Sequence, residues 1–183
     1  MMVCPNNAVI VRGRDMSPEM LFDLPDEASR TKYGELLNLM RSRRSVRTFD
    51  DRGVPRNVID AVVEAVATAP MGIPPSDVEI LILDNREKVA EFAGDMVDLM
   101  VKSRWVFSLP MRIFMRAFYA KEEIESLKTF VLPLIDVLRE KREQGVDWLL
   151  YNAPLAMYFY TSAGADPADP LVAATYAVLA AES

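Results

Sequence analysis

The sequence predicts an α+β fold, and three observations support this prediction. First, apolar residues recur every three or four positions in several long segments, as they do on the buried face of a helix. Second, positions 78–83 and 155–161 have the length and the apolar or aromatic content of strands. Third, a chain of 183 residues with 51% hydrophobic and 26% charged residues has the composition of one soluble domain with a sizeable core.

The first two predicted helices lie on either side of a polar turn at positions 50–53. The first begins near Lys32, and its apolar face consists of Tyr33, Leu36, Leu37 and Met40. Pro55 suits the first position of the second helix, because its missing N–H costs nothing there. This helix should end at Pro70 and should pack in the core through Val58, Ile59, Val62, Val63 and Val66.

A strand and two further helices follow. Positions 78–83 are almost continuously apolar, so we expect a largely buried strand. Asn85 should cap the next helix, whose apolar face consists of Val89, Phe92, Ala93, Met96, Leu99 and Met100. Another helix should run from Glu122 to Lys141, with a kink at Pro133, and end before Gly145.

The second strand, at positions 155–161, precedes an alanine-rich helix at the end of the sequence. Between them, positions 164–168 predict a turn. Asp169 is expected as the N-cap of the helix and Pro170 as its first residue. The small alanine side chains would allow another helix to approach this one closely.

Composition excludes several function classes. The absence of histidine removes Ser-His-Asp and Cys-His catalysis, histidine-ligated zinc and a histidine general base, so an enzyme of this sequence should depend on a cofactor. The net charge of −6 argues against non-specific nucleic-acid binding. No apolar run has the length of a transmembrane helix, and none ahead of Arg12 resembles a secretory signal. We therefore predict a cytoplasmic protein.

The most informative motif is Arg-Arg-Ser-Val-Arg-Thr-Phe at positions 43–49, where the first predicted helix ends. Guanidinium groups bind phosphate through paired hydrogen bonds, so Arg43, Arg44 and Arg47 indicate a phosphorylated ligand. Ser45 adds a hydroxyl donor. The alternative is a solvated helix end, because cations also interact favourably with the C-terminal end of a helix dipole.

This motif and the helical segments around it resemble the opening of the FMN-dependent nitroreductase family. The resemblance implies that Arg43, Ser45 and Arg47 hold the flavin phosphate, ribityl chain and ring edge, with Arg44 as a neighbouring contact. It also implies a homodimer and a nitroreductase-like α+β fold, in which helices flank a central mixed or antiparallel sheet. The resemblance covers positions 32–183.

The second flavin-binding loop of the family corresponds to positions 69–77. The family pattern has serine, asparagine and glutamine where this sequence has Met71, Pro74 and Ser76, so side-chain recognition of the ring is altered here. Backbone contacts at Pro70, Met71 and Gly72 remain expected, since glycine permits close approach to a ligand. A proline-stiffened loop without a ligand is the alternative.

The N-terminal segment resembles the tail of a ferredoxin module, which some nitroreductases carry. Cys4, followed by proline, would be one ligand of a 4Fe-4S cluster in a longer parent chain, and a free thiol is the alternative. We expect a module tail at 1–12, a linker at 13–31 and a partial nitroreductase-like domain at 32–183. The sequence also stops within the family's core helix, so truncation at both ends is expected.

The resemblance implies an FMN-dependent oxidoreductase that reduces nitro, quinone or activated-alkene compounds. Electrons would come from NAD(P)H or a ferredoxin-type donor and pass through the flavin by ping-pong transfer, with no catalytic side chain. The aromatic-rich segment 104–119 would form a lid over the flavin. It also suits an alternative function, a non-catalytic domain that binds a membrane or a partner through this segment. A flavin-binding regulator is a further possibility.

Overall fold

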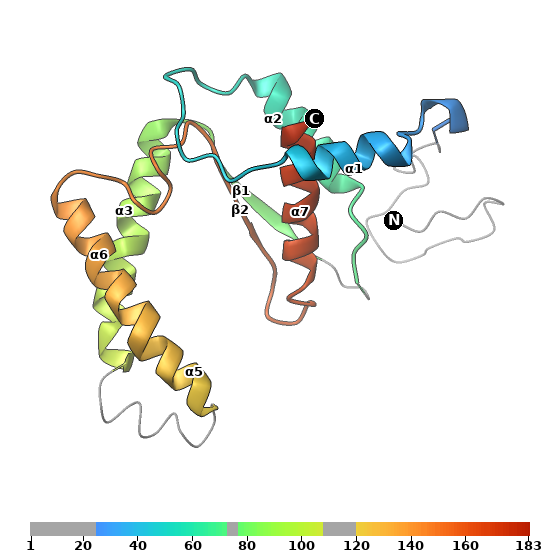
Figure 1. The fold of residues 1–183 in the computed structure, drawn as a ribbon. Helices are drawn as coiled ribbons and strands as arrows, with labels where there is room; N and C mark the ends of the chain where they lie inside the picture. Colours follow the sequence, from blue (N-terminus) through green and yellow to red (C-terminus); the bar gives the residue numbers. More distant parts are fainter. Residues whose placement is uncertain (1–24, 73–76, 108–119) are drawn as a thin grey trace. The chain divides into compact units, whose positions relative to one another are not determined.

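The computed structural model describes residues 25–72, 77–107 and 120–183. These residues form helices and a small sheet, so the predicted α+β fold is confirmed (Figure 1). They divide into two compact units. The first unit includes the described parts of segments 1–45, 55–80 and 159–183, and the second includes those of 46–54 and 81–158.

The described residues of the first unit contain three α-helices: α1 (Tyr33–Ser42), α2 (Arg56–Ala67) and α7 (Asp169–Glu182). A short 3-10 helix, η2 (Glu27–Ser29), precedes α1 within the stretch expected as a linker. Both α1 and α2 pack against α7. Ile59 is 2% exposed in α2 and Ala173 is 0% exposed in α7, so the small side chains of α7 allow the expected close packing.

Three local predictions in this unit need correction. Pro55 is the N-cap of α2 rather than its first residue, with an extended ψ of 145°. Val58 is 44% exposed, because the buried face of α2 is the narrower stripe of Ile59, Val62 and Val66. Asp169 is the first residue of α7 rather than its N-cap, which is Ala168, and the Asp169 carboxylate accepts a hydrogen bond from the Gly72 N–H.

The second unit contains a helical pair formed by α3 (Arg86–Lys102) and α6 (Leu132–Glu143). Asn85 caps α3 as predicted, since its side chain accepts the Lys88 N–H at 2.9 Å. The apolar face of α3 was predicted in part: Val89 and Ala93 are buried, but Leu99 is 57% exposed. The buried stripe continues at Val97, at regular four-residue steps.

The helical run before α6 changes its type twice. It begins as α5 (Lys121–Ser126), continues as the π-helix η4 (Leu127–Val131) and then becomes α6. The kink expected at Pro133 stays a prediction, and the structure shows a π-helical turn just before this proline, where a missing N–H and the ring disfavour regular α-helical geometry.

The end of α6 follows the prediction that the helix stops before Gly145. Gly145 has a positive φ of 74°, in the left-handed conformation that glycine adopts without steric cost. The N–H groups of Gly145 and Val146 are donated to the carbonyls of Arg142 and Lys141, both at 2.9 Å. This is a Schellman motif, which satisfies two of the last carbonyls of the helix.

The sheet of the described residues pairs β1 (Glu79–Leu83) with β2 (Ala156–Tyr160) in antiparallel orientation. The prediction of a largely buried first strand is wrong, because Leu81 is 40% exposed and the burial alternates along β1. In an antiparallel sheet only one face needs to be covered. The Tyr160 hydroxyl donates to Glu79 Oε2 at 2.6 Å, and this hydrogen bond raises the pKa of Tyr160.

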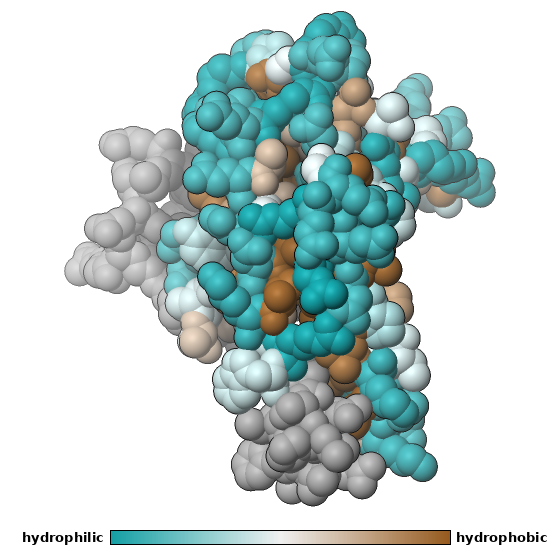
Figure 2. Space-filling view, turned by 90° about the vertical axis from the view of Figure 1, so that its left-hand side faces the viewer, coloured by the Kyte–Doolittle hydropathy of each residue, from teal (hydrophilic) through white to brown (hydrophobic). Residues whose placement is uncertain are grey.

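Much of the 104–119 segment lies outside the described residues. Its beginning belongs to the 3-10 helix η3 (Ser103–Phe107), in which Trp105 is 65% exposed. In the described ranges, no helix combines the length and the apolar composition needed to cross a bilayer. Figure 2 shows a face on which hydrophilic residues predominate and apolar residues appear in smaller groups between them.

Candidate functional site

The predicted arginine cluster begins where α1 ends. Arg43 is the C-cap of the helix, and its N–H is donated to the Leu39 carbonyl at 3.3 Å. The Arg44 guanidinium donates to backbone carbonyls of this last turn, including that of Arg43 at 2.9 Å. These hydrogen bonds stabilise the end of the helix. Arg43 and Ser45 are exposed beside it.

The arginines at the end of α1 have no acidic neighbour among the residues that the structure describes. In the described part of the chain, no carboxylate lies within ion-pair distance of Arg41, Arg43, Arg44 or Arg47. Carboxylates do pair with Arg52, Arg56, Arg104, Arg139 and Arg142. The cluster thus keeps its positive charge available in a chain of net charge −6. An exposed group of uncompensated guanidiniums is suited to an anionic ligand.

The second predicted loop, at residues 69–72, contacts the start of α7. The Gly72 N–H is donated to Asp169 Oδ1 at 2.8 Å, and Asp169 is only 3% exposed. Glycine at position 72 does permit a close approach, but in this structure the approaching group is Asp169, whose Oδ1 would lie 3.2 Å from an added Cβ. Pro70 is exposed and Met71 half-buried next to it.

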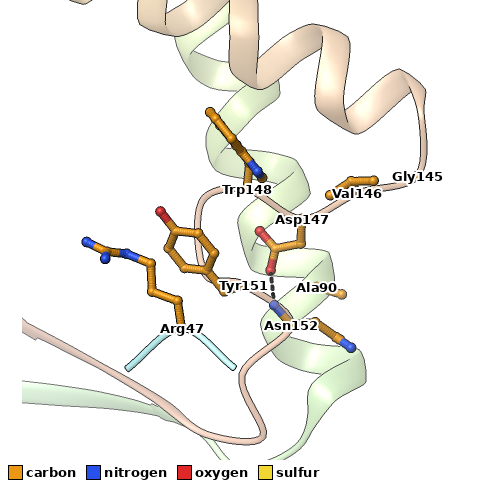
Figure 3. A pocket seen from close by; sticks show the side chains of 8 residues that line it. All are labelled: Arg47, Ala90, Gly145, Val146, Asp147, Trp148, Tyr151 and Asn152. Atoms are coloured by element: carbon orange, nitrogen blue, oxygen red, sulfur yellow. Dashed lines mark hydrogen bonds between the residues drawn. The ribbon is translucent and has the colours of Figure 1, made fainter. Parts of the chain in front are cut away.

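Arg47 belongs to the second unit, where it lines a cavity of about 510 Å³ (Figure 3). Its guanidinium carbon lies 5.4 Å from the centre of the Tyr151 ring, a distance at which a cation and an aromatic face attract each other. Trp148 forms another part of the wall and is 46% exposed. The cavity combines a cation with aromatic surfaces.

The wall of this cavity includes a backbone turn in a rare conformation. Tyr151 and Asn152 have φ values of 57° and 54°, which are uncommon for residues other than glycine. The Asp147 carboxylate stabilises the turn by accepting backbone N–H groups of Leu149, Leu150 and Asn152 at 2.9–3.0 Å. The sequence analysis did not identify Asp147 as a residue that stabilises this turn, although an aspartate after a helix-ending glycine is typical of such turns.

Arg86, in the first turn of α3, connects this turn to the segment that carries Arg47. Its guanidinium donates to the backbone carbonyls of Asn152 and Asp50. Sequence reasoning did not identify Arg86 either. No local pattern reveals it, because its partners lie 36 and 66 residues away in the chain.

The predicted site residues divide between the two units. Arg43, Arg44, Ser45 and loop residues 70–72 belong to the first unit, and Arg47 belongs to the second. Cys4 lies outside the described residues, as do Pro74 and Ser76. Within residues 25–72, 77–107 and 120–183, no group of three or more cysteine or acidic residues has a geometry suited to a metal ion.

Comparison with known proteins tests the family resemblance. A model of the "Nitroreductase family" matches residues 40–182. The chain belongs to the nitroreductase family. The sequence-based resemblance and the nitroreductase-like fold are therefore confirmed.

Characterised nitroreductase relatives include enzymes with different names. "FMN reductase [NAD(P)H]" of Bacillus subtilis is 29% identical over 118 residues, which are 62% of this chain and 45% of that protein. "Iodotyrosine deiodinase 1" of Rattus norvegicus is 28% identical over 115 residues, or 59% of this chain and 39% of the relative. The mouse deiodinase matches with the same identity and coverage. The chain thus spans less than half the length of these relatives.

Proposed function

We propose that this nitroreductase-family chain is part of an FMN-dependent oxidoreductase. The observation that carries the proposal is the exposed cationic cluster at positions 43–47, which has no carboxylate partner in the described residues. The family match and the FMN reductase relative also support it. A chain without histidine agrees with chemistry supplied by a cofactor.

The donors present suit the phosphate end of FMN. Arg43 and Ser45 would bind and neutralise the phosphate, and Arg47 would interact with the ring edge, where a cation stabilises added negative charge. Arg44 would add positive potential from the end of α1. The Gly72 N–H is already donated to Asp169, so it is omitted from this donor set, while Pro70 and Met71 would contact the ligand.

When bound, the flavin would supply the redox chemistry, and the chain would bind and orient it. NAD(P)H or a ferredoxin-type protein would be the donor and a nitro, quinone or activated-alkene compound the acceptor, each using the site in turn by ping-pong kinetics. We further propose a cytoplasmic homodimer. A parent chain with additional N-terminal cysteines would also hold a 4Fe-4S cluster through Cys4.

The test is to purify the full-length protein, record its visible absorption and titrate it with FMN. We expect a flavin spectrum and tight binding, followed by NAD(P)H oxidation that depends on a nitroaromatic or quinone acceptor. Free riboflavin, which lacks the phosphate, is the matched control ligand and should bind much more weakly. A protein that contains no flavin and does not bind added FMN would refute the proposal.

Reductive deiodination is a second candidate reaction, because two of the relatives are named iodotyrosine deiodinases. The same flavin-loaded protein can be supplied with an iodinated tyrosine and a reductant, and iodide release can be measured. Iodide release without nitroaromatic turnover would favour this reaction. Nitroaromatic turnover without iodide release would favour the first one.

Two non-catalytic alternatives predict other outcomes. A flavin-binding regulator would bind FMN and reduce none of these acceptors. A membrane-associated domain would sediment with lipid vesicles through the exposed Trp105 and would not bind flavin. A Trp105→Ala variant separates the second alternative from non-specific sedimentation.

A further inference from the structure

Asp169 is the one acidic residue in the described part of the chain whose side chain is buried, with 3% exposure. It lies in the first turn of α7, next to the loop that follows α2. Burial of a carboxylate is unfavourable unless hydrogen bonds or local positive potential compensate for the lost water. Hydrogen-bond donors or positive potential should therefore lie next to the Asp169 carboxylate, and the structure shows both.

Two of the features around Asp169 help to compensate for its burial. The Gly72 N–H donates to Asp169 Oδ1 at 2.8 Å, which is a charge-assisted hydrogen bond of normal length. The position in the first turn of α7 places the carboxylate at the positive end of a 14-residue helix. This hydrogen bond joins residues 97 positions apart in the sequence. It holds the backbone of the loop against the start of α7.

The loop backbone lies so close to Asp169 that position 72 has little room for a side chain. A Cβ added at Gly72 would lie 3.2 Å from Asp169 Oδ1, 3.5 Å from Oδ2 and 3.6 Å from the Asp166 Cβ. The first residue of the loop, Ala69, is 4% exposed, and its N–H is donated to the Val66 carbonyl at 2.9 Å. Both ends of the segment 69–72 are thus fixed, and Pro70 and Met71 lie between them.

We infer that Asp169 is a positioning residue for the ligand-binding loop, because its buried carboxylate holds Gly72 and so sets the backbone at Pro70 and Met71. This inference rests on the proposed function, which names FMN as the ligand of the loop. It adds to that proposal a residue that contacts the loop without being one of the proposed FMN ligands. Its effect on binding would be indirect, through the order of the loop.

The experiment compares Asp169→Ala, Asp169→Asn and wild type in the full-length protein. Hydrogen exchange of the Gly72 amide, followed by NMR with glycine-labelled protein, reports the hydrogen bond without any flavin. FMN titration and the visible spectrum of bound FMN report the loop. In Asp169→Ala we expect roughly tenfold faster exchange, roughly tenfold weaker FMN binding and a shifted spectrum, the size expected for one charge-assisted hydrogen bond. Asp169→Asn keeps an acceptor oxygen and should restore most of each property.

A second pair of variants tests the contact if Asp169→Ala does not fold. Gly72→Ala introduces a Cβ at 3.2 Å from Asp169 Oδ1, whereas Gly164→Ala adds one with no atom within 4 Å. We expect weaker FMN binding in Gly72→Ala and unchanged binding in the Gly164→Ala control.

The results separate this inference from the proposed function. If wild type does not bind FMN, the proposed function fails, and the Gly72 exchange rate still decides whether Asp169 holds the loop. If wild type binds FMN, and Asp169→Ala binds it with the same affinity and spectrum, the positioning role is refuted. Unchanged Gly72 exchange in Asp169→Ala would refute the hydrogen bond itself.

Discussion

Two groups of arginines differ in the partners that the fold provides. In the second unit, Arg104 pairs with Asp136, and Arg142 pairs with Asp98 while also donating to the Gly94 carbonyl. At the end of α1, Arg43 has no carboxylate partner in the described residues. The first group therefore stabilises contacts with α6, whereas the charge of Arg43 is not neutralised by a carboxylate of the described residues. Residue type alone does not reveal this difference, because both groups are exposed or half-buried cations.

The largest expected effect on FMN binding follows from removing the arginines that have no carboxylate partner in the described residues. We expect Arg43→Ala combined with Arg47→Ala to weaken FMN binding by about 100-fold or more, since a hydrogen bond to a charged group contributes about 1.5–3 kcal/mol. FMN titration measures this change. The control is Arg56→Ala combined with Arg139→Ala, which removes the same charge from exposed helix positions that pair with carboxylates. Equal losses in both double variants would remove the distinction between the groups.

Arg86 differs from both groups, because its guanidinium binds backbone carbonyls rather than a carboxylate. It donates to two backbone carbonyls and thereby connects the segment of Arg47 to the turn at Tyr151 and Asn152. We expect Arg86→Met to weaken FMN binding by about tenfold, because the carbonyls left without a donor destabilise this arrangement. Arg86→Lys should recover part of the affinity. An unchanged affinity in Arg86→Met would show that Arg47 does not depend on this connection.

A smaller effect is expected from the paired group. Arg104→Met should lower the melting temperature by about 1–3 °C, because partly exposed ion pairs contribute little to stability. Its two carboxylate contacts to Asp136 are each only partly shielded from water, with both side chains 41% exposed. The variant should bind FMN as wild type does, within about twofold. A loss of flavin here would contradict the purely structural role of Arg104.

The smallest expected effect concerns acid pH. The Arg104 guanidinium hydrogen-bonded to Asp136, and that of Arg142 to Asp98, lower the pKa of each carboxyl in the folded state. A lowered folded pKa adds stability that is complete above the unfolded-state pKa of about 4 and is lost as the pH falls through the folded pKa. The stability difference between wild type and Arg104→Met should therefore shrink below about pH 4. Urea unfolding at several pH values measures it.

Several elements of the fold were predictable because their signals are local. The Asn85 cap, the helix end at Gly145 and the apolar spacing of α2 each depend on residues within a few positions of one another. The predictions of buried side chains failed where burial depends on how a neighbouring helix packs. Val58 and Leu99 have the correct residue type for a core, yet they are exposed, because the partner helix covers a narrower stripe than the apolar pattern.

In the candidate site, too, the local motif was predictable and the contacts between distant residues were not. The sequence alone identified the motif at 43–49, and its family was confirmed, because guanidiniums and a hydroxyl at this spacing are visible without coordinates. The roles of Arg43, Arg44, Ser45, Arg47, Pro70 and Met71 in binding FMN stay predictions, as does that of Gly72, whose N–H is donated to Asp169 in this structure. Asp169, Asp147 and Arg86 were not assigned to the site, although each contacts the backbone of a segment that contains or adjoins a predicted site residue.

The sequence by itself determined local features of this protein: the main α-helices and the two strands of the described residues, and the run of arginines at the end of the first helix. Only the tertiary structure decided which charged groups are paired and which buried carboxylate holds the loop at Gly72. The physical reason is distance along the chain. Helix periodicity and capping operate over a few residues, whereas the Gly72–Asp169 hydrogen bond joins positions 97 residues apart and exists only after the helices pack.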